Sequence, residues 1–307
     1  MTEPQARILR IERLSTFDGE GLRTVVFLKG CPLACRWCST PESQRGGPDF
    51  GVARSKCTGC FACTEACPEK ALSWDIQSER FMTDMSRCTD CRQCIAACPT
   101  GAREAWGYTA TAGEIFREVE KDSLFYFHSG GGVTISGGEP LVQAAFTANL
   151  LERCITHGIS TAIETSGSVP WENMAPALPW TDTLFYDLKH MDDEAHRRLT
   201  GKGNTRILEN LKQADASDNR FSIIVRMPVI PGCNDDPDNI QALGDHCRNL
   251  KKLTEIQLLP YHRLGIETYR RMSLAYGLEG VASPDTTTME SLADILRQMD
   301  LPVRIGS

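Results

Sequence analysis

Three cysteines near the start of the chain, Cys31, Cys35 and Cys38, have the spacing C-x3-C-x2-C. Thiolates are soft ligands that suit iron–sulfur clusters and zinc. A closed four-iron cluster takes four cysteines, but the next cysteine, Cys57, lies well downstream. Three cysteines would leave one iron open to a small molecule, much as a catalytic zinc keeps an open position. The spacing predicts a reactive [4Fe–4S] cluster; a zinc site or a disulfide is the alternative.

Eight further cysteines form two copies of the pattern C-x2-C-x2-C-x3-C-P. In the bacterial ferredoxin run of this spacing, the fourth cysteine binds the other cluster. The copies therefore predict two [4Fe–4S] clusters with crossed ligands. One is held by Cys57, Cys60, Cys63 and Cys98, and the other by Cys88, Cys91, Cys94 and Cys67. A zinc ribbon would need pairs of cysteines instead. Two clusters in so short a segment would form an electron relay, with metal binding as its main structural support.

Two short motifs follow predicted strands. In the first, Gly137 and Gly138 would let a ligand approach the backbone, and Glu139 offers a carboxylate to an ammonium group. In the second, Asp187 and Lys189 are two residues apart on an extended segment and so share a face. An ordinary turn and a weak surface ion pair are the alternative interpretations.

The three-cysteine spacing resembles the signature of radical S-adenosylmethionine (SAM) enzymes. Residues 18–32, DGEGLRTVVFLKGCP, are similar to the start of the activases of glycyl radical enzymes. That family usually has Gly-Pro-Gly where this chain has Gly19-Glu20-Gly21, a departure that concerns contacts with the partner more than the chemistry. The resemblance covers nearly the whole chain.

The resemblance also implies roles for individual residues. Glu139, with its two glycines, would hold the SAM amino group, and Lys189 would meet the SAM carboxylate. The three cysteines of the first motif and Lys189 are the expected catalytic residues. The remaining cofactor contacts implied are Trp37 against the adenine, and Ser39, Ser166, Asp187, Leu188 and His262 around SAM. Glu164 and Asp187 would supply hard oxygen ligands to a monovalent cation, supported by Arg226.

The implied activity is that of an oxidoreductase. The reduced cluster would split SAM into methionine and a 5′-deoxyadenosyl radical, which would remove hydrogen from a glycine Cα in a large partner enzyme. Isethionate sulfite-lyase is our favoured partner among those of activases with a two-cluster insert, and flavodoxin or ferredoxin the expected electron donor. The alternatives are a radical SAM enzyme acting on a small molecule, and an iron–sulfur electron-transfer protein.

Strands alternating with helices must position these groups. This order predicts βαβ units and a parallel sheet. Six apolar strands are predicted, at residues 24–28, 133–136, 160–164, 183–187, 222–226 and 255–259. Six units are too few for a closed barrel, so we expect a partial (β/α)6 barrel of the TIM type, the fold that the resemblance implies. Residues 1–52 and 106–307 would form this barrel, with a ferredoxin-like insert at 53–105. Residues 8–14 are a predicted edge strand, and 44–51 a linker.

The composition agrees with a cytoplasmic metalloprotein. The chain has 307 residues, 14 cysteines and a net charge of −7, which argues against nucleic acid as the main partner. No secretory leader or long apolar run is apparent, so we expect a cytoplasmic protein that is not bound to a membrane. With the resemblance, we also expect it to be anaerobic and monomeric. Cys154, Cys233 and Cys247 lack cluster spacing and are predicted to be small buried side chains.

Overall fold

The structure, a computed structural model, describes residues 3–77 and 80–306. In this part of the chain, a nine-stranded sheet has the order β13-β12-β11-β10-β9-β8-β2-β1-β7. Neighbours from β2 to β13 are parallel, whereas β1 is antiparallel to both β2 and β7. The strands are β1 (Gln5–Ser15), β2 (Arg23–Leu28), β7 (Tyr108–Thr111), β8 (Gly132–Gly137), β9 (Ser160–Thr165), β10 (Thr183–Asp187), β11 (Ser222–Val229), β12 (Leu253–Pro260) and β13 (Val303–Ile305).

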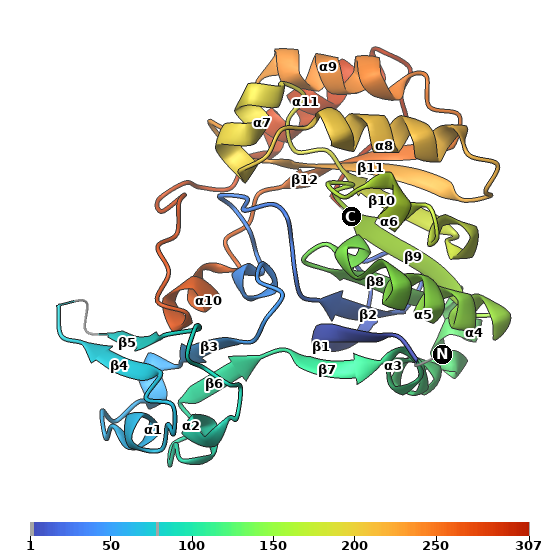
Figure 1. Cartoon of the computed structure of the whole chain (residues 1–307). Coiled ribbons are helices and arrows are strands. Elements are labelled where there is room, and N and C mark those ends of the chain that lie inside the picture. The colour runs from blue at the N-terminus through green and yellow to red at the C-terminus, as the bar shows by residue number, and fades with distance from the viewer. Residues whose placement is uncertain (1–2, 78–79, 307) are drawn as a thin grey trace.

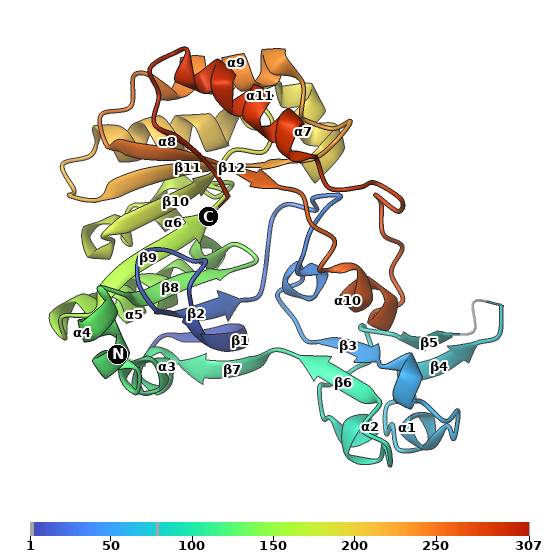
Figure 2. The ribbon, with the colours of Figure 1, turned by 180° about the vertical axis from the view of Figure 1, so that it is seen from behind.

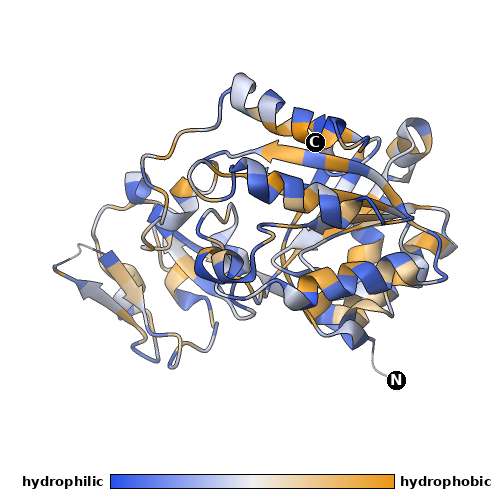
Figure 3. Ribbon diagram, turned by 90° about the horizontal axis from the view of Figure 1, so that it is seen from above, coloured by the Kyte–Doolittle hydropathy of each residue, from blue (hydrophilic) through white to orange (hydrophobic). Residues whose placement is uncertain are grey.

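Helices between the strands cover the outside of the curved sheet (Figures 1 and 2). In Figure 3 the strands are mostly hydrophobic, whereas the helices carry both hydrophobic and hydrophilic residues. The buried sides of the helices share one apolar core with the sheet. The barrel helices are α3 (Ala112–Glu120), α4 (Ser123–Ser129), α5 (Ala144–Thr156), α6 (Trp171–Met174), α7 (Asp193–Thr200), α8 (Thr205–Ala216), α9 (Pro237–Cys247) and α11 (Thr286–Arg297). The predicted partial barrel is confirmed.

Local sequence explains where several helices begin. Thr111 accepts a hydrogen bond from the backbone of Glu114, whose side chain bonds back to Thr111, so α3 starts with a capping box. Asp236 caps α9, with Pro237 at the first helical position. Asp192 and Asp285 cap α7 and α11 in the same way.

The first strand is not at the edge of the sheet, so that prediction was wrong. β1 lies between β2 and β7, and its residues Gln5 and Ile8 pair with Thr111 and Tyr108 of β7. The sequence did not indicate β7 because it is short and forms only where the chain returns from the insert. Helix α4 and the short helix α10 (Ile266–Arg271) were also missed.

The cysteine-rich insert lies beside the barrel, next to β1 and β7 (Figure 2). Its two short helices, α1 (Ala62–Glu65) and α2 (Gln93–Ala96), each follow a residue in the left-handed conformation, Phe61 and Arg92, both with φ of 58°. The repeat in sequence is thus a repeat in backbone structure. A hairpin of β4 (Leu72–Asp75) and β5 (Arg80–Thr83) joins the two halves.

A two-stranded ribbon carries the chain into and out of the insert. β3 (Asp49–Val52) pairs antiparallel with β6 (Arg103–Trp106). The segment 44–51, predicted to be a linker, therefore ends in a strand, because its last residues find a partner far along the sequence.

The three cysteines without cluster spacing lie in the barrel region. Cys154 and Cys247 are fully buried in the main core, as predicted. Cys233 is partly buried, against a smaller cluster that contains Trp37 and Tyr261. No helix in the described ranges, 3–77 and 80–306, is long and apolar enough to cross a membrane.

Candidate active site

The loop that carries Cys31, Cys35 and Cys38 follows the C-terminal end of β2. Gly30 begins it with a φ of 98°, a conformation that favours glycine. The backbone N–H groups of Ala34 and Arg36 donate to carbonyls at the end of α7, Thr200 at 2.7 Å and Leu199 at 3.0 Å. Backbone hydrogen bonds therefore hold the loop against the end of α7, which is far away in sequence.

Gly137 and Gly138 lie at the end of β8, directly beside this loop. A Cβ on Gly137 would collide with the backbone of Leu28, and one on Gly138 with the carbonyl of Gly30. The backbone N–H of Glu139 donates to the Gly30 carbonyl at 2.7 Å. The two glycines therefore make room for neighbouring backbone, and their expected contact with a ligand stays a prediction.

A cavity of about 330 Å³ opens at the C-terminal ends of the parallel strands, within the range of small-molecule sites. It brings together residues predicted from separate motifs, namely Cys31, Cys35, Trp37, Cys38, Ser39, Gly137, Gly138, Glu164, Ser166, Asp187, Lys189, Arg226 and His262. Asp18 also lines it, although we had not singled it out as a site residue. The signal was available, since Asp18 opens the run that carries the resemblance.

Two predicted residues do not line this cavity. The Leu188 side chain is buried in the barrel core, and its backbone N–H donates to the Arg226 carbonyl at 2.9 Å. Glu139 is fully buried, and its carboxylate accepts hydrogen bonds from Thr165 Oγ1 at 2.7 Å and from Ser166 N and Oγ at 2.9 and 2.7 Å. Glu139 thus orients Ser166, which does line the cavity.

A network of charged side chains forms the floor of the cavity. Arg226 donates to Glu164 at 2.7 Å and to Asp187 at 3.2 Å, and Lys189 also donates to Asp187 at 3.2 Å. Burial by itself would raise the pKa of Asp187, but Lys189 and Arg226 lower it. Burial by itself would lower the pKa of Lys189, but the nearby Asp187 and Cys35 raise it above its ordinary value. The site therefore holds a charged Asp187 and a charged Lys189.

Asp18 has a different environment. Burial and, more weakly, the nearby Glu164 carboxylate raise the pKa of Asp18 to about 6. Its backbone carbonyl accepts a hydrogen bond from Thr134 Oγ1 at 2.7 Å, which fixes the loop beneath the cavity.

The three thiols of the loop fit an iron–sulfur cluster. Burial raises the pKa of Cys31 to about 12 and that of Cys35 to about 11. Thiolates at these positions therefore need a strong positive partner, which iron provides. Among the described residues, no three His, Cys, Asp or Glu side chains are grouped to hold a single metal ion. A cubane of four irons and four sulfides is larger than one ion and spaces its ligands more widely.

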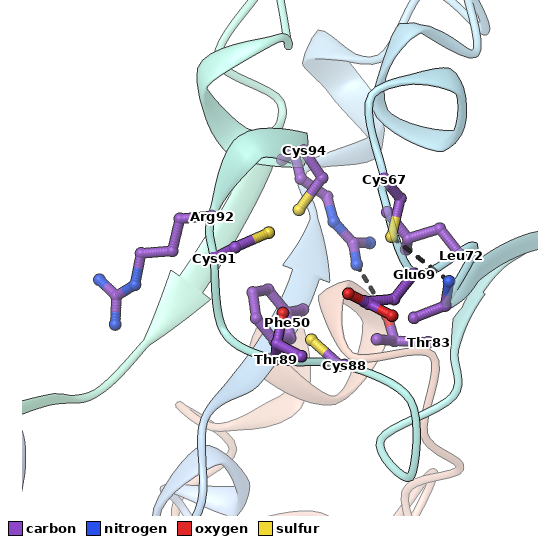
Figure 4. Close-up of a pocket in the computed structure, with 12 residues that line it drawn as sticks. Phe50, Cys67, Glu69, Leu72, Thr83, Cys88, Thr89, Cys91, Arg92 and Cys94 are labelled. Carbon is purple, nitrogen blue, oxygen red and sulfur yellow. Dashed lines mark hydrogen bonds between the residues drawn. The ribbon is translucent and has the colours of Figure 1, made fainter.

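The insert contains a second cysteine-lined cavity (Figure 4), whose cysteines come from both copies of the repeat. Cys88, Cys91 and Cys94 line it together with Cys67 from the first copy. Their side chains converge although Cys67 is distant in sequence, as crossed ligands require. In the other half, burial raises the pKa of Cys63, and Cys98 is close enough to add to this shift.

An arm between β12 and α11 connects the two cysteine-rich regions. On the barrel side, Tyr261 packs with Trp37, and the Arg36 guanidinium donates to the Gly277 carbonyl at 3.1 Å. On the insert side, Arg80 donates to the Ser273 carbonyl at 3.1 Å, and Arg271 pairs with Glu104 at 3.2 Å. Helix α10, within this arm, therefore lies between the three-cysteine loop and the insert (Figure 1).

Three family models match this chain, and together they cover the three-cysteine loop, the insert and a large part of the barrel. The Radical SAM superfamily matches residues 86–243, a 4Fe-4S dicluster domain matches 56–102, and a 4Fe-4S single cluster domain matches 17–55. Among solved structures, a radical SAM methyltransferase from Sphaerobacter thermophilus has a TM-score of 0.55 at 15% identity, covering 99% of this chain and 77% of that one. At this identity the match supports the fold alone.

Curated relatives match over almost their whole length. The isethionate sulfite-lyase activating enzyme of Nitratidesulfovibrio vulgaris is 43% identical over 94% of each chain. The (2S)-3-sulfopropanediol dehydratase activating enzyme of Klebsiella oxytoca is 42% identical, over 91% of this chain and 89% of its own. The choline trimethylamine-lyase activating enzyme of Oleidesulfovibrio alaskensis is 37% identical over 99% of each. The chain therefore belongs to the glycyl radical enzyme activating enzymes of the Radical SAM superfamily, which use iron–sulfur clusters and SAM.

Proposed function

We propose that this activating enzyme works from the cavity at the end of β2, with a [4Fe–4S] cluster on Cys31, Cys35 and Cys38. The observation that carries this proposal is the shared cavity, in which three thiols face the charged Lys189 and Asp187. When bound, the cluster supplies the electron that splits SAM and so produces the radical that takes hydrogen from a glycine Cα of the partner. The protein contributes binding, orientation and exclusion of water.

The residues around the cavity would bind the cofactor by charge and shape. The Lys189 ammonium is suited to the SAM carboxylate, and Asp187 keeps it in place. The Ser166 hydroxyl, oriented by Glu139, offers a polar contact close to the loop. Trp37, Ser39 and His262 line the side of the cavity that would receive the adenosine. Glu139 orients Ser166, and its expected contact with the SAM amino group stays a prediction.

The monovalent cation between Glu164 and Asp187 stays a prediction. Both carboxylates offer oxygens, but each already accepts a hydrogen bond from Arg226. A cation there would have to share these oxygens with the guanidinium group. Titration of SAM binding with K⁺ and Na⁺ chlorides, against tetramethylammonium chloride, would test the site.

For the insert we propose two further [4Fe–4S] clusters with crossed ligands, giving three in total. The convergence of Cys67 with Cys88, Cys91 and Cys94 supports this assignment (Figure 4). These clusters would relay electrons from flavodoxin or ferredoxin towards the barrel. We further propose that the enzyme is a cytoplasmic monomer.

The proposed partner is isethionate sulfite-lyase, on the basis of the 43% identical relative. The 42% identical relative makes (2S)-3-sulfopropanediol dehydratase the second candidate. Anaerobic incubation of the reconstituted enzyme with SAM, dithionite and each candidate separates them. A glycyl radical signal in the electron paramagnetic resonance spectrum of isethionate sulfite-lyase is expected; a signal with the dehydratase alone would overturn this choice.

A pair of variants tests the catalytic cluster itself. Cys35→Ala should abolish the formation of 5′-deoxyadenosine from SAM under dithionite, because one of three cluster ligands is lost. Cys91→Ala should retain it, because dithionite can reduce the barrel cluster without the insert. Persistent 5′-deoxyadenosine in Cys35→Ala would refute the assignment. Absence of SAM cleavage in the unmodified enzyme under dithionite would favour a simple electron-transfer protein instead.

A further inference from the structure

A basic cavity of about 210 Å³ lies where the insert meets the arm. Its lining includes four arginines, Arg54, Arg80, Arg270 and Arg271, and none of its described lining residues is acidic. The chain as a whole carries a net charge of −7. A local concentration of arginine on an acidic protein creates a positive field that attracts an oppositely charged partner.

Neighbouring carboxylates neutralise only part of this charge. Arg271 pairs with Glu104 and Glu267, each at 3.2 Å. Arg270 approaches Glu267 only to 3.9 Å, and both of their side chains are mostly exposed, so this pair is weak. Arg80 is bonded to a neutral carbonyl, that of Ser273. Arg270, whose pair is weak, and Arg80, whose printed bond is to a carbonyl, therefore contribute positive charge to this surface.

Aromatic side chains form the adjoining surface. Phe61, Trp74 and Phe81 form a mutual cluster with ring centroids 4.8 to 5.8 Å apart. Phe61 is 40% exposed and Trp74 is 39% exposed, although they pack against each other edge to face. Trp74 and Phe81 line the basic cavity itself. Tryptophan and arginine dominate the residues that contribute most to protein–protein binding.

Residues of one proposed insert cluster site also lie at this surface. Cys57 and Gly59 line the basic cavity, and Cys60, next to them in sequence, is exposed. A Cβ on Gly59 would have nothing within 4 Å, so no side chain covers this loop at that point. Cys31 and Cys35, in contrast, are only partly exposed and line the barrel cavity.

We propose that the basic and aromatic surface around Arg54, Arg270 and Trp74 is the docking site of an acidic one-electron carrier protein. This inference rests on the proposed function, because it needs a cluster on Cys57, Cys60, Cys63 and Cys98. The carrier loses one electron and this cluster gains it, with no transfer of atoms. The positive surface steers the carrier, and the aromatic rings exclude water from the contact.

The test measures binding rather than turnover. An acidic flavodoxin in its oxidised form is titrated into the reconstituted enzyme by calorimetry at low and at high salt. The double variant Arg54→Glu/Arg270→Glu should weaken binding by about tenfold or more and flatten the salt dependence, because opposite charges become like charges. Trp74→Ala should weaken binding without changing the salt dependence.

The control carries the same change in charge elsewhere. Arg248→Glu/Arg297→Glu alters exposed residues just after α9 and at the end of α11, on the outside of the barrel, and should leave binding unchanged. Equal affinity in the two double variants would overturn the docking site. Iron content equal to that of the unmodified enzyme shows that the insert is intact. Dithionite-driven SAM cleavage is measured in parallel, since its absence in the unmodified enzyme would refute the proposed function and not the docking site.

Discussion

The barrel and the insert differ in what stabilises their folded structures. The barrel has one continuous apolar core to which both the sheet and its helices contribute, with Ile135, Leu150 and Leu211 among its fully buried side chains. The buried cluster of the insert consists of Phe50, Cys63, Leu72 and Cys94, and two of these four are proposed cluster ligands. Apolar burial is the main stabilising term for a domain of the barrel's size. A module with so small a core depends on its metals instead.

Because the two regions are stabilised differently, each can be stable without the other within one chain. The insert is joined to the barrel by the β3–β6 ribbon and by contacts of the arm, such as the pair of Arg271 with Glu104. Its loss need not disturb the barrel core, because the core residues come from the barrel elements. Each of the following changes tests that independence.

The largest effect should follow removal of iron. Chelation under oxidising conditions should unfold the insert and leave the barrel folded. Hydrogen exchange should become fast in α1 and α2, while amides of β8 to β10 keep their protection. Cys94→Ala should have the same effect on the insert, whereas Cys154→Ala, in the barrel core, should retain the insert's iron. Loss of protection in both regions together would contradict the independent stability of the barrel and the insert.

The second change is a cavity in the barrel. Leu150→Ala removes a fully buried side chain on α5 and should lower the free energy of unfolding by about 2–5 kcal/mol. Urea unfolding of the barrel measures this loss. The iron content of the insert should be unchanged at low urea. Leu124→Ala, at a residue that is 67% exposed, is the matched control and should have almost no effect.

The third change concerns pH, and it should affect the barrel alone. The pKa of Asp18 is about 6 in the folded chain, against an ordinary value of 3.8. Between these values the folded state binds more protons than the unfolded state, so this residue's contribution to stability falls as pH rises from about 4 to about 6. Asp18→Asn should therefore gain stability relative to the unmodified chain over that interval. Parallel stability curves for the two proteins would contradict the shifted pKa.

The smallest effect is expected at the start of α3. Thr111→Ala removes the capping box that links Thr111 to Glu114 and should cost about 1 kcal/mol of barrel stability. Thermal unfolding measures the change, and Thr111→Ser, which keeps the hydroxyl, should restore most of it. A loss of iron from the insert in Thr111→Ala would show that the two regions are coupled through β7.

The sequence by itself indicated the class of chemistry and the main parallel strands of the barrel. Cysteine spacing within a single loop identified the three-ligand site, because one iron–sulfur cluster constrains residues close together in the chain. The repeat beginning at Cys57 and Cys88 identified the insert in the same way. Apolar runs located strand β2 and the strands β8 to β12, since burial on both faces leaves a local signature. The contact of Lys189 with Asp187 could also be predicted, because the two residues are two apart at the end of one strand.

Only the tertiary structure decided how distant segments meet. It placed β1 inside the sheet through its pairing with β7, and it brought Cys67 beside Cys88. It also placed the Glu139 carboxylate against Ser166. These outcomes depend on which segments of backbone and which side chains lie next to one another once the whole chain has folded. Local spacing cannot encode them, because the competing partners lie far apart in sequence.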